Sequence, residues 1–171
     1  QGAPDLTGFV IRVPRPDPRQ VQPTRDELDR LMHCPDLALR FLIHCGAEAG
    51  LRFATAIALR PCDVQGSYVR TTTKRGSTTN VPVSPGLARV LMAMPANTPT
   101  NSTERIVDIL NTRPVRSSTT FQDRWTAWNK QCGVRKELRC HERRLGRERR
   151  IWKATGDLRN AQSILGHKSL A

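Results

Sequence analysis

The stretch AGLRFATAIALR, residues 49–60, places Arg52 between a glycine and a short apolar segment that ends in a second arginine, Arg60. Gly50 follows a long apolar run, where a glycine favours the end of a helix. Residues 53–60 then predict a short helix that Pro61 ends, because proline cannot donate a backbone hydrogen bond. Taken alone, Arg52 would be interpreted as a surface cation at a helix end.

Two helices are predicted ahead of this stretch. Thr24 and Glu27 have the spacing of a capping box, and the apolar residues behind them recur at helical intervals. We therefore expect a first helix from near Thr24 to near Cys34. Asp36 can cap a second helix, which is too apolar for a surface element and should lie in the core.

A β-hairpin is predicted after the short helix. Ser67 to Thr73 and Thr78 to Ser84 are rich in β-branched residues and alternate, with residues 74–77 (KRGS) as a turn between them. Lys74 should therefore lie at the hairpin tip. Later signals predict a helix over 87–94, a polar loop over 95–103, a short strand over Arg105–Leu110, a helix from Ser117 or Ser118 to about Cys132, and helices over 137–154 and 157–165.

The elements together predict a mainly α fold with a small β-hairpin or sheet, an α+β architecture. Phe121, Trp125 and Trp128 recur at helical spacing, and we interpret them as core residues and not as a platform for stacking bases. Residues 1–23 contain five prolines and predict an extended arm or interdomain linker ahead of a domain at residues 24–171.

The composition indicates a polyanionic partner. The chain carries 28 Lys and Arg against 15 Asp and Glu, a formal charge of +13, and nucleic acid is the commonest partner of such a surface. No apolar run approaches the ~18 residues that span a bilayer, and no signal peptide is recognisable, so we expect a cytoplasmic protein without a membrane. The five cysteines are scattered and predict reduced thiols, and the spacing of Cys132, Cys140, His141 and His167 does not match a zinc site.

Four short motifs follow one another in a set order: Gly50-Leu51-Arg52, the lysine of the hairpin turn, His141-x-x-Arg144, and Leu165-Gly166-His167. This set resembles the catalytic domain of the tyrosine recombinases, the phage integrase family, over about residues 24–171. The family's fragments usually read G-L-R, T-K-x-G, H-x-x-R and L-G-H, and the step of 26 residues from His141 to His167 matches its usual interval. Each motif alone has an ordinary structural explanation, but their order makes the resemblance specific.

The resemblance implies strand cleavage and rejoining in double-stranded DNA through a 3′-phosphotyrosyl intermediate. The attacked phosphodiester gains negative charge, which two guanidinium groups can hold bidentately. A hairpin lysine would protonate the leaving 5′ hydroxyl, and two histidines would accept a proton and donate a hydrogen bond. The implied catalytic residues are Arg52, Lys74, His141, Arg144 and His167. The implied DNA contacts are Arg52, Lys74, Arg75, Arg144 and Lys168.

The resemblance also implies a homotetramer on DNA for the full-length parent, with an upstream DNA-clamping domain and no metal or organic cofactor. The family's nucleophilic tyrosine follows the L-G-H histidine by about nine residues, whereas this sequence ends at Ala171, four residues after His167. We therefore expect the nucleophile beyond Ala171, and we expect the chain as given to bind DNA without cleaving it. The single tyrosine, Tyr68, is interpreted as a strand residue that packs in the sheet.

Two further departures from the family pattern bear on function. Thr55 stands where the family usually has an acidic residue that orients the arginine. Residues 146–150 (GRERR) are strongly charged where the family helix is apolar, which suggests a helix near the surface or a compensated frame shift over about residues 142–152. These departures leave open a catalytically inactive, degenerate DNA-binding relative of the same fold, and the composition alone also fits an RNA-binding protein.

Overall fold

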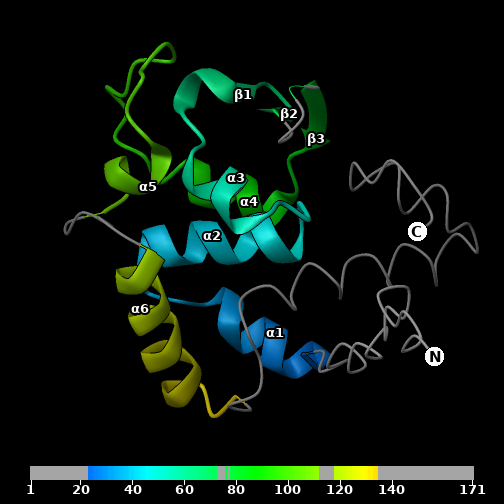
Figure 1. Cartoon of the computed structure of the whole chain (residues 1–171), viewed down its shortest axis with the longest axis vertical. Coiled ribbons are helices and arrows are strands. Elements are labelled where there is room, and N and C mark those ends of the chain that lie inside the picture. The colour runs from blue at the N-terminus through cyan, green and yellow to red at the C-terminus, as the bar shows by residue number, and fades with distance from the viewer. Residues whose placement is uncertain (1–22, 73–75, 77, 112–117, 135–171) are drawn as a thin grey trace, which may run out of the picture.

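Six α-helices, one 3-10 helix (η1) and a three-stranded sheet make up the residues that the computed structural model describes, which are 23–72, 76, 78–111 and 118–134 (Figure 1). This is the α+β architecture predicted from the sequence. The elements are α1 (Arg25–Met32), α2 (Leu37–Ala47), α3 (Phe53–Ile57), η1 (Pro61–Asp63), β1 (Val64–Gln65), β2 (Tyr68–Thr72), β3 (Thr78–Pro82), α4 (Pro85–Leu91), α5 (Ile106–Ile109) and α6 (Ser118–Gln131).

The first two helices begin at the residues that the sequence predicts. Thr24 Oγ1 accepts a hydrogen bond from the Glu27 backbone N–H at 3.2 Å, and Glu27 Oε2 accepts one from the Thr24 N–H at 2.7 Å. This reciprocal capping box satisfies two backbone donors that the first turn leaves free. Asp36 Oδ1 accepts from the Leu39 N–H at 3.0 Å and caps α2 in the same way. Both predicted caps are confirmed.

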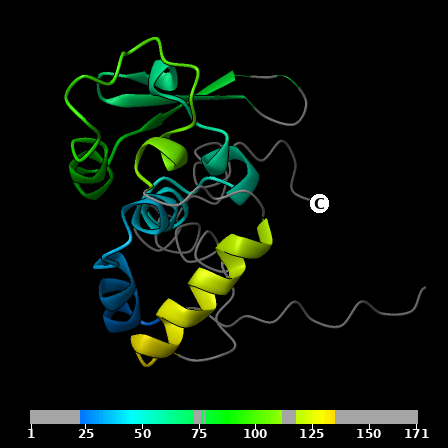
Figure 2. The same cartoon turned by 90° about the vertical axis from the view of Figure 1, so that its left-hand side faces the viewer.

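Helix α2 is the centre of the fold. Nine of its 11 residues are buried, as expected for a core helix. It contacts α1, α3, α4, α5 and α6, and Figure 2 shows it almost end-on with the other helices around it. A helix that is apolar on nearly every face can be stable in water only when neighbours cover it on all sides.

Helix α6 closes one side of this core with its aromatic residues. Phe121 and Trp125 are 3% and 1% exposed, and Trp128 packs at the edge of the core. The Trp128 indole N–H also donates to the Leu31 carbonyl at 3.1 Å, which joins α6 to α1. The interpretation of these three aromatics as core residues is confirmed.

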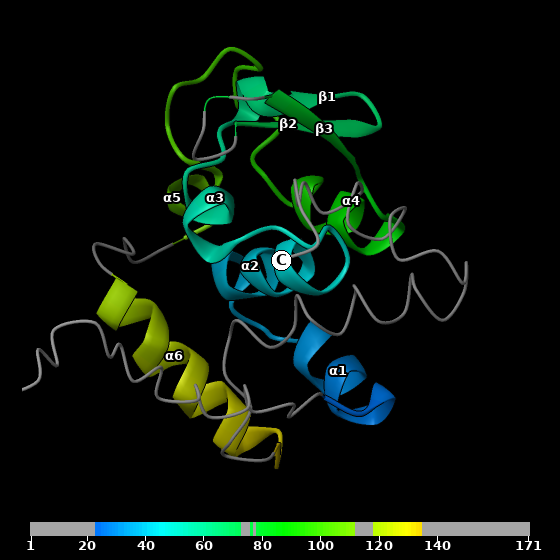
Figure 3. The same ribbon diagram turned by 45° about the vertical axis from the view of Figure 1, so that its right-hand side comes forward.

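The sheet lies at one end of the molecule, with α3, α4 and α5 between it and α2 (Figures 1 and 3). Its strand order is β1-β2-β3, and both strand pairs are antiparallel. Val69 pairs with Val81, and both are buried against the helices. The hairpin of β2 and β3 is confirmed, whereas the two-residue β1 was not predicted because its short pairing with β2 leaves no signal in the sequence.

The predicted strand over Arg105–Leu110 is wrong, because these residues form the short helix α5. The Arg105 guanidinium binds the Asp108 carboxylate at 2.6 and 3.0 Å across one helical turn, and the Leu110 N–H donates to the Ile106 carbonyl at 2.9 Å. Ile106 and Val107 are adjacent and both fully buried, which a strand with one solvated face would not allow.

Two predicted helices differ at their ends. The helix expected over 53–60 ends at Ile57, since Pro61 begins the 3-10 turn η1. The helix expected over 87–94 is α4, which starts earlier, at Pro85, with Ser84 as its cap. The prediction of a loop over 95–103 is confirmed, and the predicted arm and the helices over 137–154 and 157–165 lie outside the described residues. Within the described ranges, no helix is both long and apolar enough to span a membrane.

Candidate nucleic-acid interface

Arg52 stands at the start of α3 with its side chain exposed. Its backbone is extended, with φ −67° and ψ 147°, and its carbonyl accepts from the Ala56 N–H at 2.9 Å, which starts the helix. Its guanidinium makes no hydrogen bond or ion pair with another residue of the described ranges. An exposed guanidinium without a partner in the described ranges can accept an anionic ligand without first breaking an internal ion pair.

The turn ahead of Arg52 is set by the end of α2. Gly50 adopts a left-handed conformation with φ 67°, which other residues rarely adopt. The Ala49 N–H donates to the His44 carbonyl at 3.2 Å, and the Leu51 N–H donates to the Cys45 carbonyl at 2.9 Å. Leu51 is buried as well. The backbone that carries Arg52 is therefore tied to the core helix through hydrogen bonds and packing.

Phe53, the residue after Arg52, packs against α6. The ring of Phe53 lies 4.4 Å from that of Phe121 between centroids, at an interplanar angle of 39°. This tilted aromatic contact joins α3 to α6. Arg52 thus stands between two fixed neighbours, and its side chain is the free part of the segment.

A polar cluster of Glu48, His44 and Ser84 adjoins the same turn. The Glu48 carboxylate oxygen Oε2 accepts a hydrogen bond from the Ser84 hydroxyl and lies 2.9 Å from His44 Nδ1. Ser84 Oγ in turn accepts the Leu87 N–H at 3.2 Å as the N-cap of α4. Burial alone would raise the pKa of Glu48, but the hydrogen bonds from His44 and Ser84 outweigh it and hold the pKa below its usual value.

This cluster was not predicted from the sequence, although two signals for it are present. His44 and Glu48 are polar residues at i and i+4 in an otherwise apolar helix, where a pair would be expected to satisfy each other. Ser84 precedes Pro85, a combination typical of a helix start. What could not be foreseen is that α4 begins directly against the end of α2.

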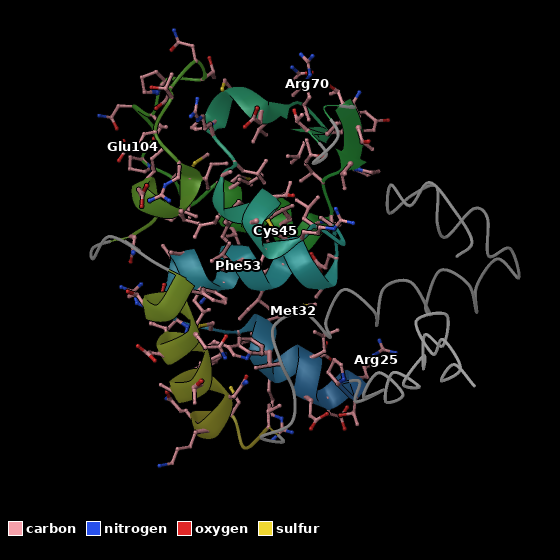
Figure 4. The ribbon with its side chains drawn as sticks, viewed as in Figure 1. Arg25, Met32, Cys45, Phe53, Arg70 and Glu104 are labelled. Carbon is pink, nitrogen blue, oxygen red and sulfur yellow. The ribbon has the colours of Figure 1, made fainter. Side chains whose placement is uncertain are left out.

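The hairpin strands lead to the predicted lysine tip, but the tip itself is not described. Tyr68, Arg70 and Thr72 face outward along β2, and Arg70 projects away from the helices (Figure 4). Tyr68 is 48% exposed, so it lies in the strand as predicted but on the outer face of the sheet. Arg52 is the predicted site residue that the structure places. The others lie outside the described residues: Lys74, Arg75, His141, Arg144, His167 and Lys168.

The positive charge of the chain is unevenly distributed. The described residues contain ten Lys and Arg and nine Asp and Glu, a formal charge of +1. The whole chain carries +13, so +12 belongs to sequence outside these ranges. The described residues are therefore almost neutral in total, and Arg52 is one of their ten positive charges.

The described cysteines, Cys34, Cys45, Cys62 and Cys132, form no disulfide with one another. Burial raises the pKa of the Cys34 thiol to about 11, which keeps it protonated near neutral pH. The described residues contain no group of three or more His, Cys, Asp or Glu side chains that could hold a metal ion. The zinc arrangement considered from the sequence involves residues of which only Cys132 is described.

The comparison with protein families finds the phage integrase family over residues 23–171. A comparison with curated protein sequences finds no significant match. Among solved structures, the chain resembles a crystal structure of XerA recombinase with a TM-score of 0.68 and 21% identity, over 87% of this chain and 57% of that one.

Two structures of XerH site-specific recombinase bound to difH substrate are also similar. The post-cleavage complex, with a palindromic difH substrate, has a TM-score of 0.63 and 15% identity, over 87% of this chain and 46% of that one. The pre-cleavage complex has the same TM-score and identity, and 48% of that chain is covered. At these identities the likeness shows the fold alone. The chain spans about half the length of the structures that it matches.

Proposed function

Since the chain belongs to the phage integrase family of tyrosine recombinases, we propose that residues 24–171 are the DNA-binding catalytic domain of a site-specific recombinase or integrase. The full-length parent would cleave and rejoin DNA strands within a homotetramer. Structures of this fold bound to a substrate, those of XerH with difH, support a ligand for this domain, which we propose is double-stranded DNA.

The single observation that carries the proposal is the geometry of Arg52. The residue occupies the G-L-R position of the family, is exposed on a fixed backbone, and has no ion-pair partner in the described ranges. A guanidinium held in this way can donate two parallel hydrogen bonds to the non-bridging oxygens of a phosphate. Such a contact strengthens as the phosphate gains charge, which favours the transition state over the ground state.

The remaining roles follow the family pattern and belong to the same proposal. A tyrosine hydroxyl attacks the phosphorus and gives its proton to one of the two histidines, the bond from phosphorus to the 5′ oxygen breaks, and the leaving 5′ oxygen takes a proton from Lys74. Arg144 supplies the second guanidinium, while His141 and His167 accept a proton and donate a hydrogen bond to the phosphate. Lys74, Arg75, Arg144 and Lys168 add contacts to the DNA backbone, which would make binding strongly dependent on salt.

A second candidate is a relative of the same fold that binds DNA without catalysing recombination. Thr55, which replaces the usual acidic residue, favours this reading, because it is half-buried on α3 and carries no charge to pair with Arg52. Both candidates predict DNA binding through Arg52. The two candidates differ in one prediction: an active recombinase, as the full-length parent, forms a covalent complex with a nicked DNA substrate, and the non-catalytic relative does not.

The test of the shared prediction is the affinity of the 171-residue chain for a fluorescently labelled 30-base-pair duplex, measured by anisotropy over a series of salt concentrations. Arg52→Ala should weaken binding about 10-fold or more, since a charge-assisted bidentate contact contributes roughly 1.5–3 kcal/mol. It should also reduce the salt slope by about one. Arg52→Lys should recover part of the affinity, because it keeps the charge and loses the fork.

The matched control is Lys130→Ala, which removes one exposed positive charge from the last turn of α6. Its effect should be small, because screening limits the reach of a surface charge to about 10 Å. Equal losses in the Arg52→Ala and Lys130→Ala variants would contradict the assignment of Arg52 to a phosphate. Tighter binding to structured RNA than to duplex DNA would contradict the ligand class.

A further inference from the structure

We propose that Glu48, held by His44 and Ser84, is the positioning residue for Arg52 and takes the place of the acidic residue that is missing at position 55. This inference rests on the proposed function, because it assumes that Arg52 binds a DNA phosphate. It differs from the family pattern in placing the acidic group before the arginine, at the end of α2, and not on α3.

Glu48 joins two helices. It is the C-cap residue of α2, and its carboxylate accepts the Ser84 hydroxyl at the start of α4. Ser84 Oγ receives the Leu87 N–H at 3.2 Å, so a continuous hydrogen-bond chain runs from the α4 backbone to Glu48. His44 holds the same carboxylate from the other side at 2.9 Å. The end of α2 is therefore fixed against α4.

Only a short segment of the chain joins Glu48 to Arg52. Three residues separate them, and the turn they form is closed by hydrogen bonds to the carbonyls of His44 and Cys45 at 3.2 and 2.9 Å. Gly50 supplies the left-handed conformation that lets the chain reverse there. Because the turn has little freedom of its own, a shift of Glu48 would be passed to the backbone of Arg52.

The start of α4 also packs closely against the cluster, on one side of a pocket that His44, Glu48 and Gly86 help to line. A Cβ atom added at Gly86 would lie 2.7 Å from Glu48 Oε2 and 2.7 Å from both Cε1 and Nδ1 of His44. His44 is itself 6% exposed. The lowered pKa of Glu48 means that the carboxylate is charged at neutral pH, where its hydrogen bonds are strongest.

The Arg52 side chain itself has no partner in the described ranges. Thr55 cannot form an ion pair, and no residue of the described ranges is bonded to the Arg52 guanidinium. Within the described ranges, the position of Arg52 is therefore set through its backbone, and the turn that Glu48 anchors holds that backbone in place. A preorganised arginine binds phosphate more tightly because less motion is lost on binding.

The test is a double-mutant cycle on the affinity of the 171-residue chain for the 30-base-pair duplex. Glu48→Gln should weaken binding about 5-fold, even though removing a negative charge would by itself favour DNA. Glu104→Gln is the matched control, because Glu104 is exposed and lies across the molecule from the end of α2 (Figure 4). This control should leave the affinity unchanged or slightly higher.

The decisive measurement is Glu48→Gln in the Arg52→Ala background, where the inference predicts no further loss of affinity. Ser84→Ala keeps every charge and removes both the hydrogen bond to Glu48 and the α4 cap; it should weaken binding by a smaller factor that also vanishes in that background. All variants are compared at a temperature where urea unfolding shows them to be folded, so that lost stability does not appear as lost affinity.

The outcomes separate the two proposals. If Arg52→Ala binds DNA as tightly as the wild type, the proposed function fails and this inference fails with it. If Arg52→Ala weakens binding but Glu48→Gln causes the same loss in both backgrounds, the proposed function stands and Glu48 has only a structural role. If Glu48→Gln leaves the affinity unchanged or slightly higher, as expected for Glu104→Gln, the inference about Glu48 fails while the proposed function stands.

Discussion

Replacing Gly86 with alanine tests the close contact between α4 and α2. Gly86 is the second residue of α4, and a Cβ atom there would lie 2.7 Å from Glu48 Oε2 and from two atoms of the His44 ring. Contacts this short require something to move. Glu48 and His44 are the candidates, and each movement would break hydrogen bonds of the cluster.

Two effects of opposite sign decide how much Gly86→Ala changes the free energy of unfolding. Alanine is favoured over glycine inside a helix by roughly 0.5–1 kcal/mol. The atoms that Cβ would meet are the ends of the Glu48 and His44 side chains, which line a pocket, so the main cost is a hydrogen bond to the Glu48 carboxylate, roughly 1.5–3 kcal/mol when lost. This cost exceeds the gain in helix propensity, so Gly86→Ala should lower the free energy of unfolding by about 1–2 kcal/mol.

The assay is equilibrium unfolding in urea followed by tryptophan fluorescence, since Trp125 and Trp128 lie in and beside the core. A loss of about 2 kcal/mol corresponds to a midpoint lower by roughly 1 M urea. Ala88→Gly in the same helix measures the propensity term by itself. In a Glu48→Ala background, the cost of Gly86→Ala should shrink, because one of the two obstructing side chains is gone. A Gly86→Ala variant as stable as the wild type, or more stable, would refute the close contact.

Three further predictions concern other parts of the molecule. Thr24→Ala should lower the free energy of unfolding by about 1 kcal/mol through loss of the α1 cap, while Thr24→Ser should not; equal urea midpoints for the two would contradict this. The folded-state pKa of Glu48 is lowered, so its contribution to stability is complete above the unfolded pKa and is lost as pH falls through the folded pKa. The stability difference between the wild type and Glu48→Gln should therefore shrink from neutral pH to about pH 3, and a constant difference across urea titrations would count against the charged cluster. Iodoacetamide at about pH 8 should alkylate exposed Cys62 well before buried Cys34, whose pKa is raised to about 11; comparable rates by peptide mass spectrometry would show that Cys34 is accessible.

Helix starts were predictable from the sequence because their causes are local. Thr24 with Glu27, and Asp36 alone, act within three residues, and the structure shows the expected hydrogen bonds. The aromatic face of α6 was predictable for a related reason, since residues at helical spacing share one side of the helix. In both cases the residues that cause the structure lie close together in the sequence, so the sequence pattern is enough to predict it.

Elements that depend on distant partners were not predictable in the same way. Ile106 is held by a hydrogen bond from its N–H to the Leu59 carbonyl at 2.8 Å, and the run around it is too short for periodicity to separate strand from helix. The one available signal was the spacing of Arg105 and Asp108, which suits an ion pair across a helical turn. Strand β1 depends likewise on pairing with Val69 and Tyr68.

The residues of the candidate site divide in the same way between those marked by local sequence and those that depend on distant contacts. Arg52 was found because the family motif marks it, and its exposure at the start of α3 agrees with the proposed role. Glu48 was missed because its importance arises from Ser84, 36 residues further along the chain. Contacts between helices that are far apart in sequence have to be observed before their effect on a site can be argued.

The burial of nine of the 11 residues of α2 has a consequence for synthesis of the protein on the ribosome. Residues Leu37–Ala47 emerge before α4 and α6, which later cover them. At about 5–20 residues per second, the helix would wait on the order of 5 to 15 seconds for Ser118–Gln131 to follow. During that interval the nascent chain presents an uncovered apolar helix, which is the kind of segment that chaperones bind and that aggregates when they are saturated. Expression yield should therefore depend on elongation rate and on chaperone supply more than the stability of the finished fold would suggest.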